Sequence, residues 1–258
     1  MPEGDTIFRA AAQLRAGLDG ATLTRFETPR PVPGRVPQPG ERIDQVTSRG
    51  KHLLIRFSGG TTLHTHMRMN GTWRVFRPGR PWRRSPGQIR VVIETREAVA
   101  VCASAPVVEL LADDDLRRHP ILTALGPDLC DPEPDLDEAL RRMAGLEHRT
   151  PVGEALLDQR VAAGIGNVYR SEVLWLCETD PFAPIEDVTP RARRALLDTA
   201  HRQLRHNLGP GPRRTVRSGL AVYEHTGLPC LRCGTHIQMR RSGELGRSTW
   251  WCPACQRP

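Results

Sequence analysis

Apolar residues near the start of the chain recur at the spacing of one helix face. They lie three or four positions apart, which places side chains on the same side of an α-helix. Asp5, just ahead of them, is a residue type that caps helix starts. The pattern therefore predicts an amphipathic helix over residues 5–18. The apolar residues are Ile7, Ala11, Leu14 and Leu18.

Between about residues 21 and 112 the pattern changes to short segments rich in β-branched and other apolar residues. Breaks such as SGG, RPGRP and SPG separate these segments, as turns separate strands. Six or more short strands at close spacing predict a β-sandwich or a barrel. The predicted strands lie in segments 21–28, 52–57, 61–69, 72–76, 88–94 and 98–104.

A break rich in Asp, Glu and Pro separates the strand-like region from segments of helical pattern, and the tail is Gly-rich with four Cys. We expect an α+β chain, because runs of strands are followed by runs of helices. The predicted helices lie in 136–144, 151–159, 167–176 and 190–208. The predicted domains are 1–115 (helix plus β-sandwich), 116–136 (linker), 137–219 (helical) and 220–258 (Cys-bearing tail).

The composition is that of a globular protein. The 258 residues suit one large domain or two modest ones, and no apolar run approaches the length of a membrane span. The start, MPEGDTIFRAAAQLRAG, lacks the apolar core of a secretion signal. Seven Cys in such a chain suit a reducing compartment, where clustered Cys bind metal. We expect a cytoplasmic protein with no membrane partner.

The charge is concentrated at the C-terminal end. Residues 201–258 carry ten Arg and two Glu, a net charge of +8, which equals the net charge of the whole chain. Such a local basic excess indicates contact with a polyanion, most often nucleic acid. The alternative is an arginine-rich surface that only water contacts.

Four Cys in the tail have the spacing of a metal site. Two CxxC pairs separated by 18 residues match a tetrahedral four-thiolate zinc site, which is structural because it leaves no open position for water. The segment between the pairs alternates around a central SGELG turn and predicts a β-hairpin that presents Arg247. The predicted ligands are Cys230, Cys233, Cys252 and Cys255.

A glycine-containing turn precedes the predicted helix that begins at Asn167. One helix is expected to end near Gly164, and the glycines would let backbone N–H groups approach a phosphate at the start of the next helix. Asn167 could cap that helix or reach the phosphate itself. An ordinary helix–turn–helix corner explains the GIGN motif about as well.

The N-terminus offers a candidate nucleophile. Removal of Met1 before the small residue Pro2 would expose a secondary amine. An α-amino group has a pKa of about 7.7–8.0, so an appreciable fraction is neutral at pH 7. Such an amine can attack a sugar C1′ and form an iminium that acts as an electron sink. Glu3, beside it, is a candidate proton donor.

Lys51 stands out because the other 36 basic residues are all Arg. Lys, unlike Arg, can lose a proton at reachable pH. It lies in an SRGKH segment at the entry to a predicted strand, and chance or codon bias is the alternative explanation. His64 and His66 follow on one face of the next strand. We expect them to be structural or solvated, because no third metal ligand is apparent.

These motifs together resemble the formamidopyrimidine-DNA glycosylase/endonuclease VIII family. The resemblance spans nearly the whole chain in family order, and its two ends are most similar to the actinobacterial branch of endonuclease VIII-like enzymes. The motifs are MPEGDT, SRGKHLLIRF, THMRMNG, HPILTALGPD, LLDQRVAAGIGNVYRSEVL and GRSTWWCPACQ.

The resemblance implies a bifunctional DNA glycosylase and AP lyase of base excision repair. The implied fold is an N-terminal β-sandwich, a helix–two-turns–helix DNA-binding domain and a zinc-finger hairpin, with DNA held between domains. Pro2 is implied as the Schiff-base nucleophile and Glu3 as the residue that shuttles protons. Lys51 is implied to contact the reaction-centre phosphate and to donate a proton in β-elimination. Arg247 is implied to grip the flanking phosphates and to assist δ-elimination.

Two further residues are implied to bind DNA. Asn167 would bind backbone phosphate, and Met69 would fill the void left by the flipped base as an apolar wedge. A place in the core is the alternative for Met69. The resemblance implies further void-filling residues in a loop near 80–112.

The implied partner is damaged DNA, bound by a monomer in the bacterial cytoplasm at the nucleoid. One structural Zn²⁺ is expected, with no redox or nucleotide cofactor. The MPEGDT start favours oxidised pyrimidines as substrates. Two alternatives are an oxidised-purine glycosylase of the same family and a non-catalytic DNA-binding zinc protein.

Overall fold

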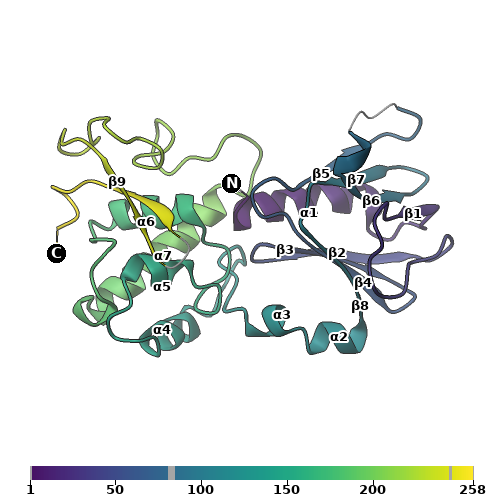
Figure 1. Cartoon of the computed structure of the whole chain (residues 1–258), viewed down its shortest axis with the longest axis horizontal. Coiled ribbons are helices and arrows are strands. Elements are labelled where there is room, and N and C mark those ends of the chain that lie inside the picture. The colour runs from purple at the N-terminus through teal and green to yellow at the C-terminus, as the bar shows by residue number, and fades with distance from the viewer. Residues whose placement is uncertain (1, 81–84, 244–245, 258) are drawn as a thin grey trace. The chain divides into compact units, whose positions relative to one another are not determined.

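The computed structural model describes residues 2–80, 85–243 and 246–257. The chain separates into two compact units (Figure 1). The first contains Pro2 and Thr6–Ala124, and the second contains Glu3–Asp5 and the chain from Leu125 onward. The first helix, α1 (Gly4–Leu18), therefore begins with two residues that belong to the second unit.

The first unit contains two four-stranded antiparallel sheets, drawn in purple to teal in Figure 1. One has the order β1 (Arg25–Glu27), β6 (Ile89–Glu94), β7 (Val99–Ala103) and β5 (Thr72–Phe76). The other has the order β2 (Ile43–Arg49), β3 (His52–Phe57), β4 (Thr61–His66) and β8 (Val107–Ala112).

One apolar core joins both sheets to α1. Alternate residues of the strands point into it, as the two-residue period of a strand requires, and the stripe predicted for α1 is fully buried there. The prediction of a sandwich is therefore confirmed. Core residues from the three layers include Leu14, Leu53, Ile55, Phe57, Leu63, Val91 and Ile93.

Two strands were not predicted. In β2 the pairing with β3 is irregular between Ile43 and Gln45, which interrupts the apolar alternation. In β8 the polar Glu109 interrupts the apolar run. The helix begins at Gly4, one residue before the predicted start, so Asp5, expected as a cap, lies in the first turn. Its Oδ2 accepts a hydrogen bond from Arg213 Nε at 2.9 Å.

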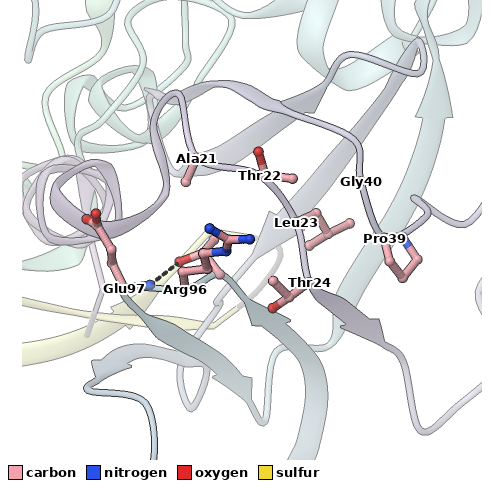
Figure 2. A pocket seen from close by; sticks show the side chains of 9 residues that line it. Ala21, Thr22, Leu23, Thr24, Pro39, Gly40, Arg96 and Glu97 are labelled. Carbon is pink, nitrogen blue, oxygen red and sulfur yellow. Dashed lines mark hydrogen bonds between the residues drawn. The ribbon is translucent and has the colours of Figure 1, made fainter.

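A pocket of about 600 Å³ lies in the first unit between the segment after α1 and the β6–β7 turn (Figure 2). It is lined by 21–24, 39–40 and 95–97. None of the residues singled out in the sequence for chemistry lies along it.

The second unit is mainly helical. α4 (Leu136–Ala144) begins after Asp135, whose side chain accepts the Glu138 N–H at 2.8 Å. α7 (Pro190–His206) begins after Thr189, with Pro190 in its first turn. Between them lie α5 (Val152–Leu157), α6 (Asn167–Leu176) and the short 3₁₀ helix η2 (Ile185–Asp187). The preceding helix was expected to end near Gly164; it ends at Leu157, and turns occupy the intervening residues.

Two short helices, α2 (Asp113–Arg117) and α3 (Pro120–Ala124), follow the last strand of the sandwich. Leu129 and Cys130, in the segment expected to be a linker, are buried. The tail forms the hairpin of β9 (Gln238–Ser242) and β10 (Arg247–Trp251), as predicted from alternation. The central turn residues 244 and 245 lie outside the described residues. Within the described part of the chain, no helix combines the length and apolar character that crossing a membrane requires.

Candidate active site and zinc centre

The carboxylate of Glu3 occupies the N-terminus of α6. Its oxygens accept backbone N–H groups from Gly166 at 2.9 Å, Val168 at 2.8 Å and Tyr169 at 3.3 Å, and its side chain is fully buried. Free N–H groups and the helix dipole both stabilise a negative charge at such a position. A buried carboxylate is thus fixed directly after Pro2 in the chain.

Close backbone packing allows this contact. The Gly4 N–H donates to the Gly164 carbonyl at 2.9 Å, and a Cβ on Gly4 would lie 2.9 Å from the Gly164 Cα. A Cβ on Gly166 would lie 2.4 Å from the Glu3 carboxylate carbon. Because the glycines of the GIGN turn lack side chains, the N-terminal segment of the chain can pack directly against that turn.

This geometry corrects the reading of the GIGN motif as a backbone phosphate site. The N–H groups that were expected to face a phosphate already donate to Glu3. Asn167 does not cap α6: Gly166 holds that position, and Asn167 is the first helical residue. The phosphate role of Asn167 stays a prediction.

The Asn167 side chain joins α6 to the hairpin. Its Nδ2 donates to the Ser248 carbonyl at 2.7 Å, and its Oδ1 accepts from Arg170. Ser248 directly follows Arg247 in β10. The structure thus brings Asn167 and the hairpin that carries Arg247 together, although 81 residues separate Asn167 from Ser248.

Arg170 was not singled out from the sequence, but it is fully buried beneath the hairpin. Its guanidinium donates to the Ser248 carbonyl at 2.8 Å and to Glu154 Oε1 at 3.0 Å. The Ser242 hydroxyl also donates to Glu154, at 3.3 Å. Burial lowers the pKa of Arg170 to about 10, and Arg247 adds to the lowering while Glu154 opposes it. The available signal was an Arg and a Glu, Arg170 and Glu172, within a helix flanked by apolar residues, since buried charges need partners.

The tail arginines divide into two groups. Arg247 is exposed at the start of β10 and is available to an anion. Arg232 and Arg240 instead stack on aromatic rings: Arg232 lies 4.3 Å from the Trp175 centroid and Arg240 lies 3.5 Å from that of Phe182. Part of the basic excess therefore stabilises the fold through cation–π contacts.

The four Cys of the tail converge as predicted. Their sulfurs all lie within 4.8 Å of one another, with 3.9 Å between Cys230 and Cys255 and 3.5 Å between Cys233 and Cys252. Zinc–sulfur bonds of about 2.3 Å in a tetrahedron require sulfurs roughly 3.8 Å apart. Trp175 Nε1 also donates to Cys230 Sγ at 3.3 Å, as the surroundings of a metal-bound thiolate do. The residues fit a structural zinc ion.

Lys51 belongs to the first unit and lies in the two-residue turn between β2 and β3. Arg49 and His52 pair across that turn, and Gly50 within it has a φ of 56°. A positive φ favours glycine, which explains the Gly of the SRGK segment. Lys51 therefore precedes the strand, at the end of a hairpin.

Met69, also in the first unit, lies in a tight turn after β4 and is 60% exposed. The Gly71 N–H donates to the Met67 carbonyl at 2.8 Å, and a Cβ on Gly71 would lie 2.6 Å from the Met67 backbone. Its exposure excludes the alternative that Met69 is a core residue.

His64 is structural, as expected, and not solvated. It is 1% exposed and hydrogen-bonded to His52 and Glu109. The expectation that no third group lies nearby is wrong: Glu109 and His119 have ligand atoms within 4.8 Å of those of His64. Strand pairing brings His64 next to Glu109, and the segment before α3 adds His119. No spacing in the sequence predicts that the three residues are close together.

Three family models match successive stretches of the chain. The formamidopyrimidine-DNA glycosylase N-terminal domain matches residues 1–105, the formamidopyrimidine-DNA glycosylase H2TH domain matches 125–215, and the zinc finger found in FPG and IleRS matches 227–258. Together they cover one sheet completely, the other except for β8, most of the helical region and the Cys-bearing tail.

Similar proteins have been described in actinobacteria. The probable endonuclease 8 2 of Streptomyces coelicolor is 42% identical over 263 residues, covering 99% of this chain and 94% of that protein. The DNA-(apurinic or apyrimidinic site) lyase Nei2 of Mycolicibacterium smegmatis is 40% identical, covering 99% of each. The Lactococcus lactis Fpg (MutM), solved with DNA containing an oxidised pyrimidine, is 24% identical with a TM-score of 0.84 over both full chains, and shows the same fold.

Proposed function

This chain belongs to the formamidopyrimidine-DNA glycosylase and endonuclease VIII family, and from that membership we propose that it excises oxidised pyrimidines and cleaves the abasic product through a Schiff base on Pro2. As a member, it is a DNA glycosylase and AP lyase. The proposed partner is damaged DNA, bound by a monomer in the bacterial cytoplasm. The burial of the Glu3 carboxylate at the α6 N-terminus, next to Pro2, carries the mechanistic proposal.

In the proposed reaction the Pro2 nitrogen attacks C1′ of the damaged nucleotide. The glycosidic bond breaks and the base leaves with the proton that the amine loses. The C1′–O4′ bond then opens, O4′ takes a proton, and a positively charged iminium links Pro2 to the ring-opened sugar. Loss of a C2′ proton then expels the 3′ phosphate, and a second elimination expels the 5′ phosphate. The nitrogen must be an amine, so Met1, which lies outside the described residues, has to be removed first.

Glu3 is proposed to shuttle protons during these steps, and its surroundings support that role. It directly follows Pro2, and three backbone N–H groups orient its carboxylate. A catalytic acid or base must be held within hydrogen-bond reach of the proton that it moves. Fixed backbone donors hold a carboxylate more rigidly than solvent would.

The remaining proposed roles concern the DNA backbone and the lesion void. Lys51 would contact the phosphate at the reaction centre and donate a proton during β-elimination. Arg247 would grip flanking phosphates, supported by its exposure and by the buried Arg170 beneath its hairpin. Asn167 would use its second amide hydrogen on phosphate. Exposed Met69 would fill the space left by the flipped base.

The proposed preference for pyrimidines rests on the MPEGDT start, which resembles that of endonuclease VIII-like enzymes, and two similar proteins have the names endonuclease 8 2 and Nei2. An oxidised-purine glycosylase is the second candidate, since the fold is shared with Lactococcus lactis Fpg, which has been solved with Fapy-dG DNA as well as with an oxidised pyrimidine. Single-turnover excision from duplexes with thymine glycol, 5-hydroxyuracil or 8-oxoguanine opposite cytosine separates the two. Faster excision of 8-oxoguanine than of both pyrimidines would overturn the preference.

Replacing Gly166 by Ala should lower activity through Glu3. An added Cβ would lie 2.5 Å from the Glu3 Oε1 and would push the carboxylate off the α6 N-terminus. We expect the single-turnover rate of base excision to fall about 100-fold, since small displacements of a reacting group have effects of that size. Gly209→Ala is the control, because an added Cβ there meets nothing within 4 Å. Equal rates for the two variants would contradict the proposed role of Glu3.

Lys51→Arg should keep a positive charge but slow strand cleavage. Arg stays protonated in proteins and cannot donate a proton as Lys does. We expect β-elimination at an abasic site to fall about 100-fold, the usual size of a general-acid contribution. The reverse exchange on the neighbouring strand, Arg56→Lys, serves as the control because Arg56 is 51% exposed and paired with Asp113. Normal cleavage by Lys51→Arg would remove Lys51 from the mechanism.

A further inference from the structure

A line of polar side chains crosses one face of the β2-β3-β4-β8 sheet. His52 pairs with His66 and His64 pairs with Glu109, so these four residues share a face opposite the apolar core. His52 Nδ1 lies 2.8 Å from His64 Nε2, and His64 Nδ1 lies 2.7 Å from Glu109 Oε2. His52 and His64 are 5% and 1% exposed, so water does not compete for the bond between their rings.

His119 contacts Glu109 at the outer end of this line. His119 Nε2 lies 3.2 Å from the same Glu109 oxygen, while His119 Nδ1 accepts the Leu122 N–H at 3.2 Å. Because Nδ1 is an acceptor, the ring proton is on Nε2 and is donated to Glu109. If His119 bound a metal ion through Nε2, its ring proton would have to lie on Nδ1. That proton would then face the Leu122 N–H, which is also a donor. The group formed by His64, Glu109 and His119 is therefore built for hydrogen bonds, not for a cation.

The carboxylate dictates the proton positions along the line. An ionised Glu109 only accepts, so His64 carries its proton on Nδ1. His64 Nε2 is then an acceptor and receives the Nδ1 proton of His52, which leaves Nε2 of His52 unprotonated. Burial lowers the pKa of His64, and it lowers that of His52 to about 3, so both rings are neutral near pH 7.

Lys51 lies at the inner end of this line. It directly precedes His52 in the β2–β3 turn, and the cross-strand partner of His52 is His66. Burial lowers the pKa of His66 to about 4, and the positive charge of Lys51 adds to the lowering at both His52 and His66. Lys51 thus directly precedes a neutral ring, and the unprotonated Nε2 of His52 is left as an acceptor.

We propose that Glu109, His64 and His52 form a hydrogen-bonded chain that locks the β2–β3 turn and positions Lys51 for the DNA strand. The inference rests on the role proposed above for Lys51. None of the three contacts the reacting atoms; they are positioning residues. The charge of Glu109, 42% exposed at the sheet surface, sets the tautomer of two buried rings and thereby leaves Nε2 of His52, the residue after Lys51, as an acceptor.

Nitrogen-15 NMR of the histidine rings in the wild-type zinc-loaded protein tests the chain without reference to activity. We expect the proton on Nδ1 in His52 and His64. We expect it on Nε2 in His66 and His119, whose Nδ1 atoms accept backbone N–H groups. Nε2–H tautomers at both His52 and His64 would overturn the proposal.

Kinetics on an abasic-site duplex test the consequence for Lys51. We expect Glu109→Ala to lower kcat for strand cleavage about 10-fold with KM within about twofold, and Glu109→Gln, which keeps an acceptor oxygen, to recover part of it. Glu94→Ala is the matched control, because Glu94 is a strand Glu paired with Arg25 in the other sheet. Equal kcat values for Glu109→Ala, Glu109→Gln and Glu94→Ala would overturn the proposal.

Two further readouts keep the outcomes distinct. Borohydride trapping of Glu109→Ala on abasic DNA should still give the Pro2 adduct, because the nucleophile is unaffected. Absence of an adduct in the wild type would instead contradict the proposed function and leave the NMR result standing.

Zinc analysis of the wild-type protein should give one ion per chain. A second zinc ion that is lost in Glu109→Ala would show a metal site at Glu109 and would overturn the hydrogen-bonded chain.

Discussion

A protein that carries a permanent extension before Pro2 should bind abasic-site DNA normally and fail to cleave it. The extension turns the Pro2 nitrogen into an amide, whose lone pair is delocalised and cannot attack C1′. We expect strand cleavage and borohydride-trapped adduct to fall on the order of 10³-fold or more, as loss of a nucleophile does. Binding, measured by fluorescence anisotropy, should change far less, because phosphate contacts supply most of the affinity.

The matched control is the same extension placed after residue 258. That protein should form the adduct and cleave as the unextended one does. Pro2→Gly is the intermediate case, since it keeps an amine but changes it from secondary to primary, and it should weaken imine chemistry more than DNA binding. An undiminished adduct from the N-terminally extended protein would show that another group, such as Lys51, is the nucleophile.

Cys252→Ser should release the hairpin and abolish activity through lost DNA contacts. Cys252 is fully buried, and its sulfur lies 3.5 Å from that of Cys233. Structural zinc in small sites contributes on the order of 10 kcal/mol to folding. The hairpin shares its small apolar cluster with Trp175, Val222 and Ile237, so we expect this region to lose its order as the zinc is lost. DNA affinity should fall about 100-fold.

The control is Cys177→Ser, which changes a Cys outside the cluster whose Sγ lies 3.4 Å from Thr199 Oγ1. It should keep one zinc ion per chain and full affinity. Mass spectrometry measures the loss of zinc, and hydrogen exchange of residues 227–257 measures the loss of order in the hairpin. Full activity of a zinc-free Cys252→Ser protein would show that the hairpin contributes nothing to DNA binding.

Local periodicity predicted much of the secondary structure. The bounds predicted for β3, β5, α4 and α6 match those observed, because each segment has a buried face or clear breaks at its ends. The prediction failed at β2 and β8, where a pairing irregularity and a polar residue disturb the alternation. The tail hairpin was found because two CxxC pairs bracket an alternating segment.

The sequence by itself determined most of the elements and the zinc ligands, since periodicity and ligand spacing are local properties that burial and metal geometry impose directly. Periodicity missed β2 and β8 and left a sandwich or a barrel open. Tertiary structure alone decided which polar groups meet. Glu3 reaches Gly166 across 163 positions, and His64 reaches Glu109 across 45. A buried carboxylate or imidazole must find a partner wherever packing supplies one, so its role becomes visible only when distant segments are in contact.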